Sequence, residues 1–196
     1  LRPMSNSIGH SFKTGVETAA LPVAQLGVYL DKIGLPLDRG AAPRQFATGL
    51  ANRNYLIRAG GQELVLRRPP DGDLPPGAHD MAREHRVLSR LWKKLPLAPR
   101  SVHLCEDKSV IGVPFQLIEY RPGIVIKGDD TSRIAGKPDV AAQLGTTLLD
   151  TLVSIHKVDA AAVGLGDFGK PDGFVDRQIA GWVGRGEALA GGLGRL

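Results

Sequence analysis

The sequence predicts an α+β protein, in which a small, mainly antiparallel sheet carries one packed helix and is followed by further helices. Three observations lead to this prediction: helical apolar spacing near the N-terminus, short strand-like runs bounded by turn residues, and a helical stripe in the second half. The predicted order is helix, three strands, helix, two or three strands, linker and helix. The predicted divisions are an N-terminal arm over residues 1–21, a lobe over residues 22–121, and a linker with helices over residues 122–196.

The first predicted helix covers residues 23–34, VAQLGVYLDKIG, where apolar residues recur at helical spacing. Gly34 and the following Pro36 end the pattern. The stripe that we expect to face the core consists of Val23, Leu26, Leu30 and Ile33.

Two strands joined by a tight turn follow, over residues 55–58 and 63–67. The intervening Ala-Gly-Gly-Gln suits a hairpin, because glycine readily adopts the positive φ that such turns need. Pro69 and Pro70 end the second strand, since proline cannot donate a hydrogen bond to a strand ladder.

The middle of the chain predicts a helix over residues 79–95 and then strands over residues 102–105, 110–113 and 115–120, with a turn at Asp107. A later helix is predicted over residues 139–157. Four glycines among the last eleven residues argue against a stable terminal helix. The apolar stripe of the later helix consists of Val140, Leu144, Leu148, Leu152 and Ile155.

Composition narrows the function classes. The chain has 196 residues, of which 42% are hydrophobic, and no run approaches the 18 apolar residues of a membrane span, so we predict no membrane partner. The single cysteine, Cys105, suits a reducing compartment, and we predict a cytoplasmic protein with a structural thiol there. The net charge of +5 admits an anionic partner. Nucleic acid is disfavoured, because the few aromatic residues fall in predicted strands.

One helix position carries a charge where the pattern expects an apolar residue. Glu84 lies on the inward stripe of the helix over residues 79–95, so it needs a partner. Side chains alternate along the second hairpin strand, so Arg67 and Arg68 point to opposite faces. We expect one arginine to meet Glu84 under the sheet and the other to face outward. The stripe consists of Met81, Glu84, Leu88, Leu91 and Leu95.

The pair has two interpretations, a structural ion pair between helix and sheet, or a clamp that holds a phosphate. Three features favour the clamp. Gly49 falls in a turn between strands, where backbone can approach a phosphate closely. Asn52 and Asn54 follow it and tolerate unusual turn geometry. The strand over residues 115–120 then leaves the sheet, and its backbone groups can pair with the edge of an adenine.

Six stretches, taken in this order, carry a family resemblance. They read FATGLANRNYLI, LVLRRPP, AREHRVLSRL, CEDKSVIGVPFQLIEYRPG, LVSIHKVD and LGDFGKPDGFVDRQIAGW. Over residues 22–185 the chain resembles the aminoglycoside phosphotransferase family, which has a protein-kinase-like fold. It is most similar to the branch that includes kinase-like domains fused to acyl-CoA dehydrogenases. The resemblance implies a nucleotide-binding lobe, with a small antiparallel sheet and one packed helix, followed by the first helices of an incomplete second lobe.

The resemblance also implies ATP and Mg²⁺ as cofactors and a small hydroxylated metabolite as phosphoryl acceptor. Gly49, with Asn52 near it, would lie in the loop that covers the phosphates. Arg67 would replace the usual phosphate-gripping lysine, and Glu84 would hold it. Backbone groups around Tyr120 would meet adenine. The implied nucleotide-binding residues are Gly49, Asn52, Arg67, Glu84, Glu119, Tyr120 and Arg121.

Two departures from the family are visible. Ala51 stands where the branch commonly has a serine that can meet phosphate. The catalytic His-Gly-Asp stretch, with an asparagine five residues after its aspartate, is not found after Gly123; Asp167 is followed at that distance by Asp172. We therefore predict no catalytic residue and no metal ligand here. We expect an N-terminal part of the family fold with negligible activity alone.

The alternative function is a non-catalytic nucleotide-binding or protein-interaction module. Part of a two-lobed fold would expose the apolar face between the lobes, which predicts self-association through that face.

Overall fold

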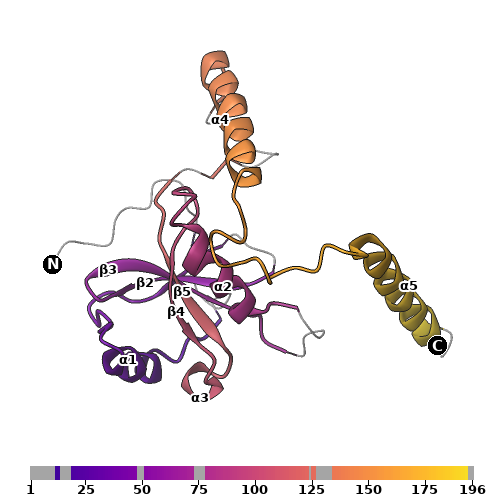
Figure 1. Ribbon diagram of the computed structural model, residues 1–196. Helices are drawn as coiled ribbons and strands as arrows, with labels where there is room; N and C mark the ends of the chain where they lie inside the picture. Colours follow the sequence, from indigo (N-terminus) through magenta and orange to yellow (C-terminus); the bar gives the residue numbers. More distant parts are fainter. Residues whose placement is uncertain are drawn as a thin grey trace. The chain divides into compact units, whose positions relative to one another are not determined.

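The computed structural model describes residues 12–13, 19–47, 51–72, 78–123, 125–126 and 134–193, with the side chains of the last helix described as far as Glu187. The chain forms two compact units, Leu1–Val158 and Asp159–Leu196, and each is described by itself. Figure 1 shows the sheet in the first unit and α5 in the second. The predicted divisions after residues 21 and 121 stay predictions.

Five strands form one sheet in the first unit, and every neighbouring pair is antiparallel. The order β1-β2-β3-β5-β4 puts β1 and β4 at the two edges, and the pairing of β4 with β5 shifts register between Ser101 and His103. The predicted α+β class and small antiparallel sheet are confirmed. The strands are β1 (Arg44–Gln45), β2 (Arg53–Ala59), β3 (Gln62–Arg68), β4 (Ser101–Cys105) and β5 (Phe115–Glu119).

The predicted hairpin is present between β2 and β3. Its turn residues Gly60 and Gly61 have φ of 57° and 77°, a conformation that glycine adopts without strain. A Cβ atom on Gly60 would lie 2.9 Å from Cδ2 of Leu35, so the Leu35 side chain would have to shift to admit a larger residue. The turn fixes the register of the hairpin, which sets Asn54 opposite Arg67.

Helix α1 (Val23–Lys32) covers one face of the sheet, called here the α1 face. Leu26 and Leu30 are fully buried, as their spacing predicts, whereas Val23 and Ile33 remain more than a third exposed, so the buried stripe is narrower than expected. Alternate residues of β2, β3 and β5 complete this core because they point to the same side. They include Tyr55, Ile57, Ala59, Leu64, Leu66, Phe115 and Leu117.

Helix α2 (Met81–Leu91) lies against β4 and β5 on the opposite face, called here the α2 face. It is shorter than the predicted span of residues 79–95. His79 has a φ of 55°, which no helix residue adopts, and the side chain of Asp80 accepts a hydrogen bond from the Arg83 N–H at 2.8 Å, so the helix begins after Asp80. Met81 and Leu95 of the predicted stripe are buried.

Two predictions about elements are wrong. Residues 110–113 are not a strand, because α3 (Lys108–Ile111) forms there: the Asp107 side chain accepts from the Ser109 N–H, and Gly112 ends the turn with a φ of 87°. A terminal helix does exist, α5 (Phe174–Leu193). The helix forms although each glycine costs roughly 1 kcal/mol relative to alanine.

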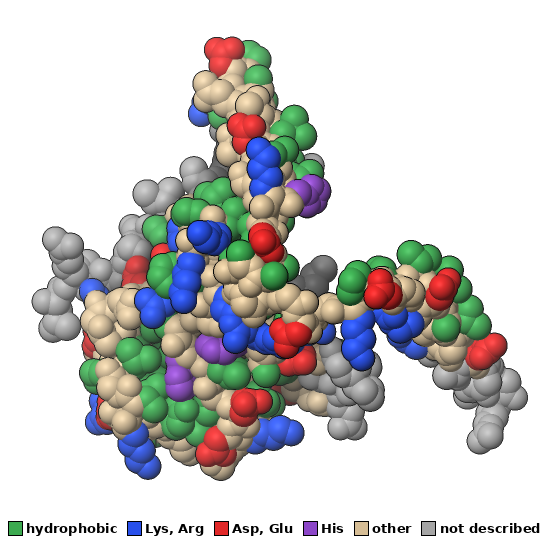
Figure 2. All heavy atoms as spheres, viewed as in Figure 1, with side chains coloured by type: hydrophobic (Ala, Val, Ile, Leu, Met, Phe, Trp, Pro, Cys, Tyr) green, Lys and Arg blue, Asp and Glu red, His purple; other side chains and the backbone are tan. Residues whose placement is uncertain are grey.

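Helix α4 (Pro138–His156) matches the prediction for residues 139–157, and its proline lies in the first turn, where no backbone N–H is needed. None of its side chains is buried, and Leu148 is 70% exposed. Figure 2 shows apolar side chains on the surface of this helix. Self-association through an exposed apolar face stays a prediction.

The described residues of the predicted arm contact the sheet. Phe12 forms an isolated bridge with Phe46, and the Lys13 N–H donates to the Gln45 carbonyl at 2.9 Å. The Tyr55 hydroxyl donates to the Ala19 carbonyl at 3.0 Å. Among the residues that the structure describes, no helix has both the length and the apolar character to cross a membrane.

Candidate functional site

An ion pair joins the sheet to α2 on the α2 face. Arg67 lies near the end of β3, and Glu84 lies in the first turn of α2. Nε of Arg67 lies 2.9 Å from Oε1 and 3.0 Å from Oε2 of Glu84. The Arg67 side chain is 30% exposed and that of Glu84 29%, so the pair is half-buried and reachable from solvent. Glu84 thus points toward the sheet, as its place on the helical stripe predicts.

The neighbouring Arg68 does not face outward as expected. It points to the α1 face, where its side chain is only 5% exposed and its Nη1 lies 2.6 Å from Oδ1 of Asp71. The hydrogen bond from Arg68 holds the pKa of the Asp71 carboxyl below its usual range. Arg68 is buried because the core on that face extends to the end of β3, where Tyr55 lies beside it.

Two asparagines bring neutral acceptors to Arg67. Asn54, its cross-strand neighbour on β2, accepts from Nη1 at 3.4 Å. The Asn52 amide satisfies all of its neighbours when its oxygen accepts from Nη2 of Arg67 at 2.8 Å and from Nε at 3.1 Å, while its nitrogen donates to Nδ1 of His79 at 2.6 Å. Three side chains therefore bond directly to the Arg67 guanidinium, and His79 reaches it through Asn52. The three are Glu84, Asn54 and Asn52.

The structure brings some of the implied residues together and separates others. Asn52, Arg67 and Glu84 form one cluster on the α2 face. Gly49, the implied loop glycine, lies outside the described residues. Ala51 is exposed and, like any alanine, offers a phosphate only its backbone N–H.

The implied adenine-binding residues lie at the end of β5. The N–H of Glu119 donates to the Arg100 carbonyl at 2.8 Å, so it is engaged within the protein. Glu119 pairs in register with Leu64 of β3, so its side chain points to the α1 face, opposite to Arg67. Tyr120 is 8% exposed, and its ring centroid lies 6.3 Å from that of Phe46.

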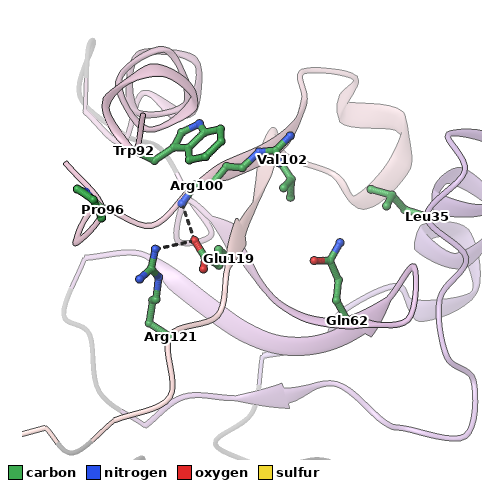
Figure 3. Close-up of a pocket in the computed structure, with 8 residues that line it drawn as sticks. All are labelled: Leu35, Gln62, Trp92, Pro96, Arg100, Val102, Glu119 and Arg121. Atoms are coloured by element: carbon green, nitrogen blue, oxygen red, sulfur yellow. Dashed lines mark hydrogen bonds and ion pairs between the residues drawn. The ribbon is translucent and has the colours of Figure 1, made fainter. Parts of the chain in front are cut away.

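The side chains of Glu119 and Arg121 instead line a cavity of about 720 Å³. Nη2 of Arg121 donates to Oε2 of Glu119 at 3.0 Å, and the backbone N–H of Arg100 donates to the same oxygen at 3.1 Å. Both interactions are drawn as dashed lines in Figure 3. Leu35 and Val102, which pack against the core on the α1 face, form another part of the wall. This cavity is therefore separate from the cluster around Arg67.

Sequence reasoning missed His79 as a member of the Arg67 cluster. The apolar spacing predicts a helix that includes residue 79, so the His79 side chain would follow the helix surface. The signal that could have corrected this is Asp80, a residue type strongly preferred at the position before a helix. A helix that starts after Asp80 leaves His79 in the loop before the helix. From there its side chain contacts that of Asn52, which lies in another loop, before β2.

Metal ligands are not grouped in the described part of the chain. Among those residues, no three or more His, Cys, Asp or Glu side chains are placed to hold one metal ion. In the Arg67 cluster the one carboxylate is already paired with the guanidinium, whose terminal N–H groups can donate to an anion. The described residues thus fit a phosphate but do not by themselves fit Mg²⁺.

A protein-family model and several known proteins are similar to this chain. Residues 43–193 match the model of the phosphotransferase enzyme family. Acyl-CoA dehydrogenase family member 10 of Mus musculus is 38% identical over 170 residues, which are 85% of this chain and 16% of that protein. Acyl-CoA dehydrogenase family member 11 of Gallus gallus is 30% identical over 147 residues, which are 75% of this chain and 18% of that protein.

A crystal structure is also similar. It is that of a Ralstonia eutropha JMP134 protein assigned as an aminoglycoside phosphotransferase, with a TM-score of 0.65 and 28% identity, covering 86% of this chain and 48% of that one. The chain thus spans less than a fifth of the two curated relatives and about half of the solved structure. These matches confirm the resemblance predicted from the sequence, including its acyl-CoA dehydrogenase branch.

Proposed function

Because this chain belongs to the phosphotransferase enzyme family, we propose that it forms the nucleotide-binding part of an ATP-dependent phosphotransferase whose acceptor is a small hydroxylated metabolite. The observation that supports the proposal is the Arg67–Glu84 pair, half-buried between β3 and α2 and flanked by Asn52 and Asn54. In the proposal, Arg67 grips a phosphate of ATP and Glu84 holds the guanidinium in place.

The hydrogen bonds of Arg67 are arranged so that its guanidinium can exchange a neutral acceptor for a phosphate oxygen. Glu84 takes the Nε–H, whereas the two terminal nitrogens bond to neutral amide oxygens of Asn54 and Asn52. A phosphate oxygen bonds a guanidinium more strongly than a neutral amide does, because both partners are charged. An arriving phosphate can therefore displace the Asn54 amide from Nη1, where the bond is long at 3.4 Å, while Glu84 and Asn52 keep the guanidinium oriented. In the ligand-free protein, the amides keep the terminal nitrogens satisfied.

Adenine would be bound by the backbone after β5. Since the Glu119 N–H already bonds to Arg100, its contribution would come from its carbonyl oxygen, with the N–H of Arg121 as the second group. Tyr120, which lies between Glu119 and Arg121 in the chain, would hold this segment in place by packing its ring against that of Phe46. The loop around Gly49 would cover the phosphates. Mg²⁺ is implied by the family, and the proposal assigns it no ligand among the described residues.

The direct test is binding of ATP to the purified chain, measured by calorimetry at constant ionic strength. We expect saturable binding that Arg67→Ala weakens at least tenfold, because a charge-assisted bond to phosphate is lost. Arg67→Lys should retain more affinity than Arg67→Ala, since the charge remains without the planar fork. Arg39→Gln is the matched control, because Arg39 is an exposed arginine paired with Asp31 on the surface. No binding by the wild-type chain, or equal binding by Arg67→Ala, would overturn the proposal.

Turnover separates the proposal from its alternative. The alternative is a non-catalytic nucleotide-binding or protein-interaction module. Its nucleotide-binding form shares the same clamp and predicts binding of ATP without phosphoryl transfer in any protein that carries this chain. For the phosphotransferase we also propose a cytoplasmic location and no membrane partner. Acceptor-dependent hydrolysis or transfer by the protein that contains this chain favours the phosphotransferase.

A further inference from the structure

The cavity on the α1 face has the features of a separate binding site. Its volume of about 720 Å³ lies within the 300–1,000 Å³ usual for small-molecule sites. Its wall combines apolar groups with a few polar ones. Figure 3 shows the side chains of Arg100, Gln62 and Leu35 approaching the cavity from different sides.

Arg100 is the charged group that remains available there. Its guanidinium carbon lies 5.0 Å from the centroid of the Trp92 ring, so the indole orients it. Trp92 is itself fixed, because its Nε1–H donates to the Ser89 carbonyl at 3.1 Å. Within the part of the chain that the structure describes, no carboxylate pairs with the Arg100 side chain.

The other charges of the cavity nearly cancel. Oε2 of Glu119 already accepts from Nη2 of Arg121 and from the backbone N–H of Arg100. Two arginines and one glutamate leave one unbalanced positive charge at the wall. An oxyanion would therefore find an oriented guanidinium without a neighbouring unpaired carboxylate to repel it.

Apolar groups line the remainder of the wall. Leu35 and Val102 are partly buried and pack against the core of the α1 face. They form a surface beside Arg100 that can contact a hydrocarbon segment of a few carbons, and Gln62 from the hairpin supplies a neutral polar group. The cavity thus offers one charged anchor and an apolar wall.

We propose that this cavity is a second binding site, distinct from the Arg67 cluster, for a small molecule with an oxyanion head and a short apolar body. The oxyanion, a carboxylate or a phosphate ester, pairs with the Arg100 guanidinium. The apolar body lies along Leu35 and Val102.

Trp92 provides the readout. The chain contains two tryptophans, and Trp182 is 68% exposed on α5, so Trp182→Phe leaves Trp92 as the sole reporter. In that background, hexanoate and hexyl phosphate are titrated at constant ionic strength, with hexan-1-ol as the neutral analogue. We expect a saturable change of Trp92 emission with at least one anion and none with the alcohol. The two anions show which head group the site prefers.

Variants locate the site. Arg100→Gln should weaken anion binding at least tenfold, since a charge-assisted bond is lost. Gln62→Glu, which places a negative charge in the same wall, should also weaken it. Arg39→Gln is the surface control, and Arg67→Ala should leave the titration unchanged because it lies on the other face. Absence of a saturable change with both anions, equal binding of the alcohol, or unchanged binding by Arg100→Gln would overturn the proposal.

Discussion

The two faces of the sheet differ in what they bury. On the α1 face, β3 contributes Leu64 and Leu66 to a closed apolar core. On the α2 face, the same strand contributes Val65 and Arg67, and Arg67 meets a carboxylate and two amides. Alternate residues of β3 therefore build the apolar core, while Arg67 on the other face is a charged group that solvent can reach. Alternation along one strand can thus place core residues and a candidate ligand-binding residue on opposite faces of a sheet.

Arg67 and Arg68 show the difference between the two faces most directly, because they are adjacent residues of the same type. Arg68 is almost fully buried on the α1 face and is held by Asp71. Arg67 is 30% exposed and has neutral amides on its terminal nitrogens. Solvent access together with exchangeable partners, more than charge alone, distinguishes the arginine suited to a ligand.

The largest expected effect is a loss of stability when a cavity is made in the core of the α1 face. Leu66→Ala removes a fully buried side chain, so the free energy of unfolding should fall by about 2–5 kcal/mol. Chemical denaturation measures it, with Leu97→Ala as control, because Leu97 is 62% exposed and its truncation should change stability by less than about 0.5 kcal/mol. Equal effects of the two variants would show that the α1 face is not the core.

The next effect comes from breaking the pair on the α2 face. Glu84→Ala should lower the free energy of unfolding by about 1–3 kcal/mol, between the values for exposed and for buried pairs, because the pair is half-buried. It should also weaken ATP binding. A double-mutant cycle with Arg67→Ala isolates the coupling between the two residues. Unchanged melting together with unchanged affinity would mean that the pair contributes nothing.

A smaller effect is expected at His79, which reaches Arg67 only through Asn52. His79→Ala removes the acceptor that orients the Asn52 amide, so ATP affinity should fall about fivefold, the equivalent of one neutral hydrogen bond of about 1 kcal/mol. Asn52→Ala should cost at least as much, because it removes the bond to Arg67 itself. An effect of His79→Ala on melting without any effect on affinity would assign His79 to the fold alone.

The smallest effect is a dependence of stability on pH. Burial lowers the pKa of His85 on the α2 side and of His103 on the α1 side. Each therefore binds its proton less readily when folded than when unfolded, where the pKa is about 6.5. Stability should be full above that pH and fall as pH is lowered through the folded pKa values. Denaturation between pH 7 and 5.5 measures the slope, and His85→Gln or His103→Gln should each flatten it; an unaltered slope in both contradicts the assignment.

The sequence predicts that one of the two arginines at the end of β3 meets Glu84, because the residues follow local periodicities of two along a strand and 3.6 along a helix. The choice of Arg67 comes from the family resemblance. It does not predict that Arg68 is buried, since that depends on how far the core of the α1 face extends. The short apolar run at residues 110–113 fits a strand or a helix equally well by pattern, and the cap at Asp107 decides for the helix. The position of His79 depends on a loop conformation that no periodicity encodes.

The sequence also does not predict toward which face of the sheet the Glu119 side chain points. That direction follows from the pairing of β5 with β3, two strands that are separated along the chain by α2, β4 and α3. Such a register is a long-range property, and a shift by one residue would reverse every side chain. The backbone position of the implied adenine-binding segment was thus predictable, whereas the cavity that its side chains line was not.

The two edges of the sheet have a consequence for association between molecules. β1 is only two residues long, and the ladder of β4 with β5 is interrupted between Ser101 and His103. Short or irregular outer strands are poor templates for the addition of a foreign strand, which is how natural sheets resist edge-to-edge aggregation. Partners that recruit proteins by extending a sheet would therefore find little to extend here, and association of this chain should proceed through side chains.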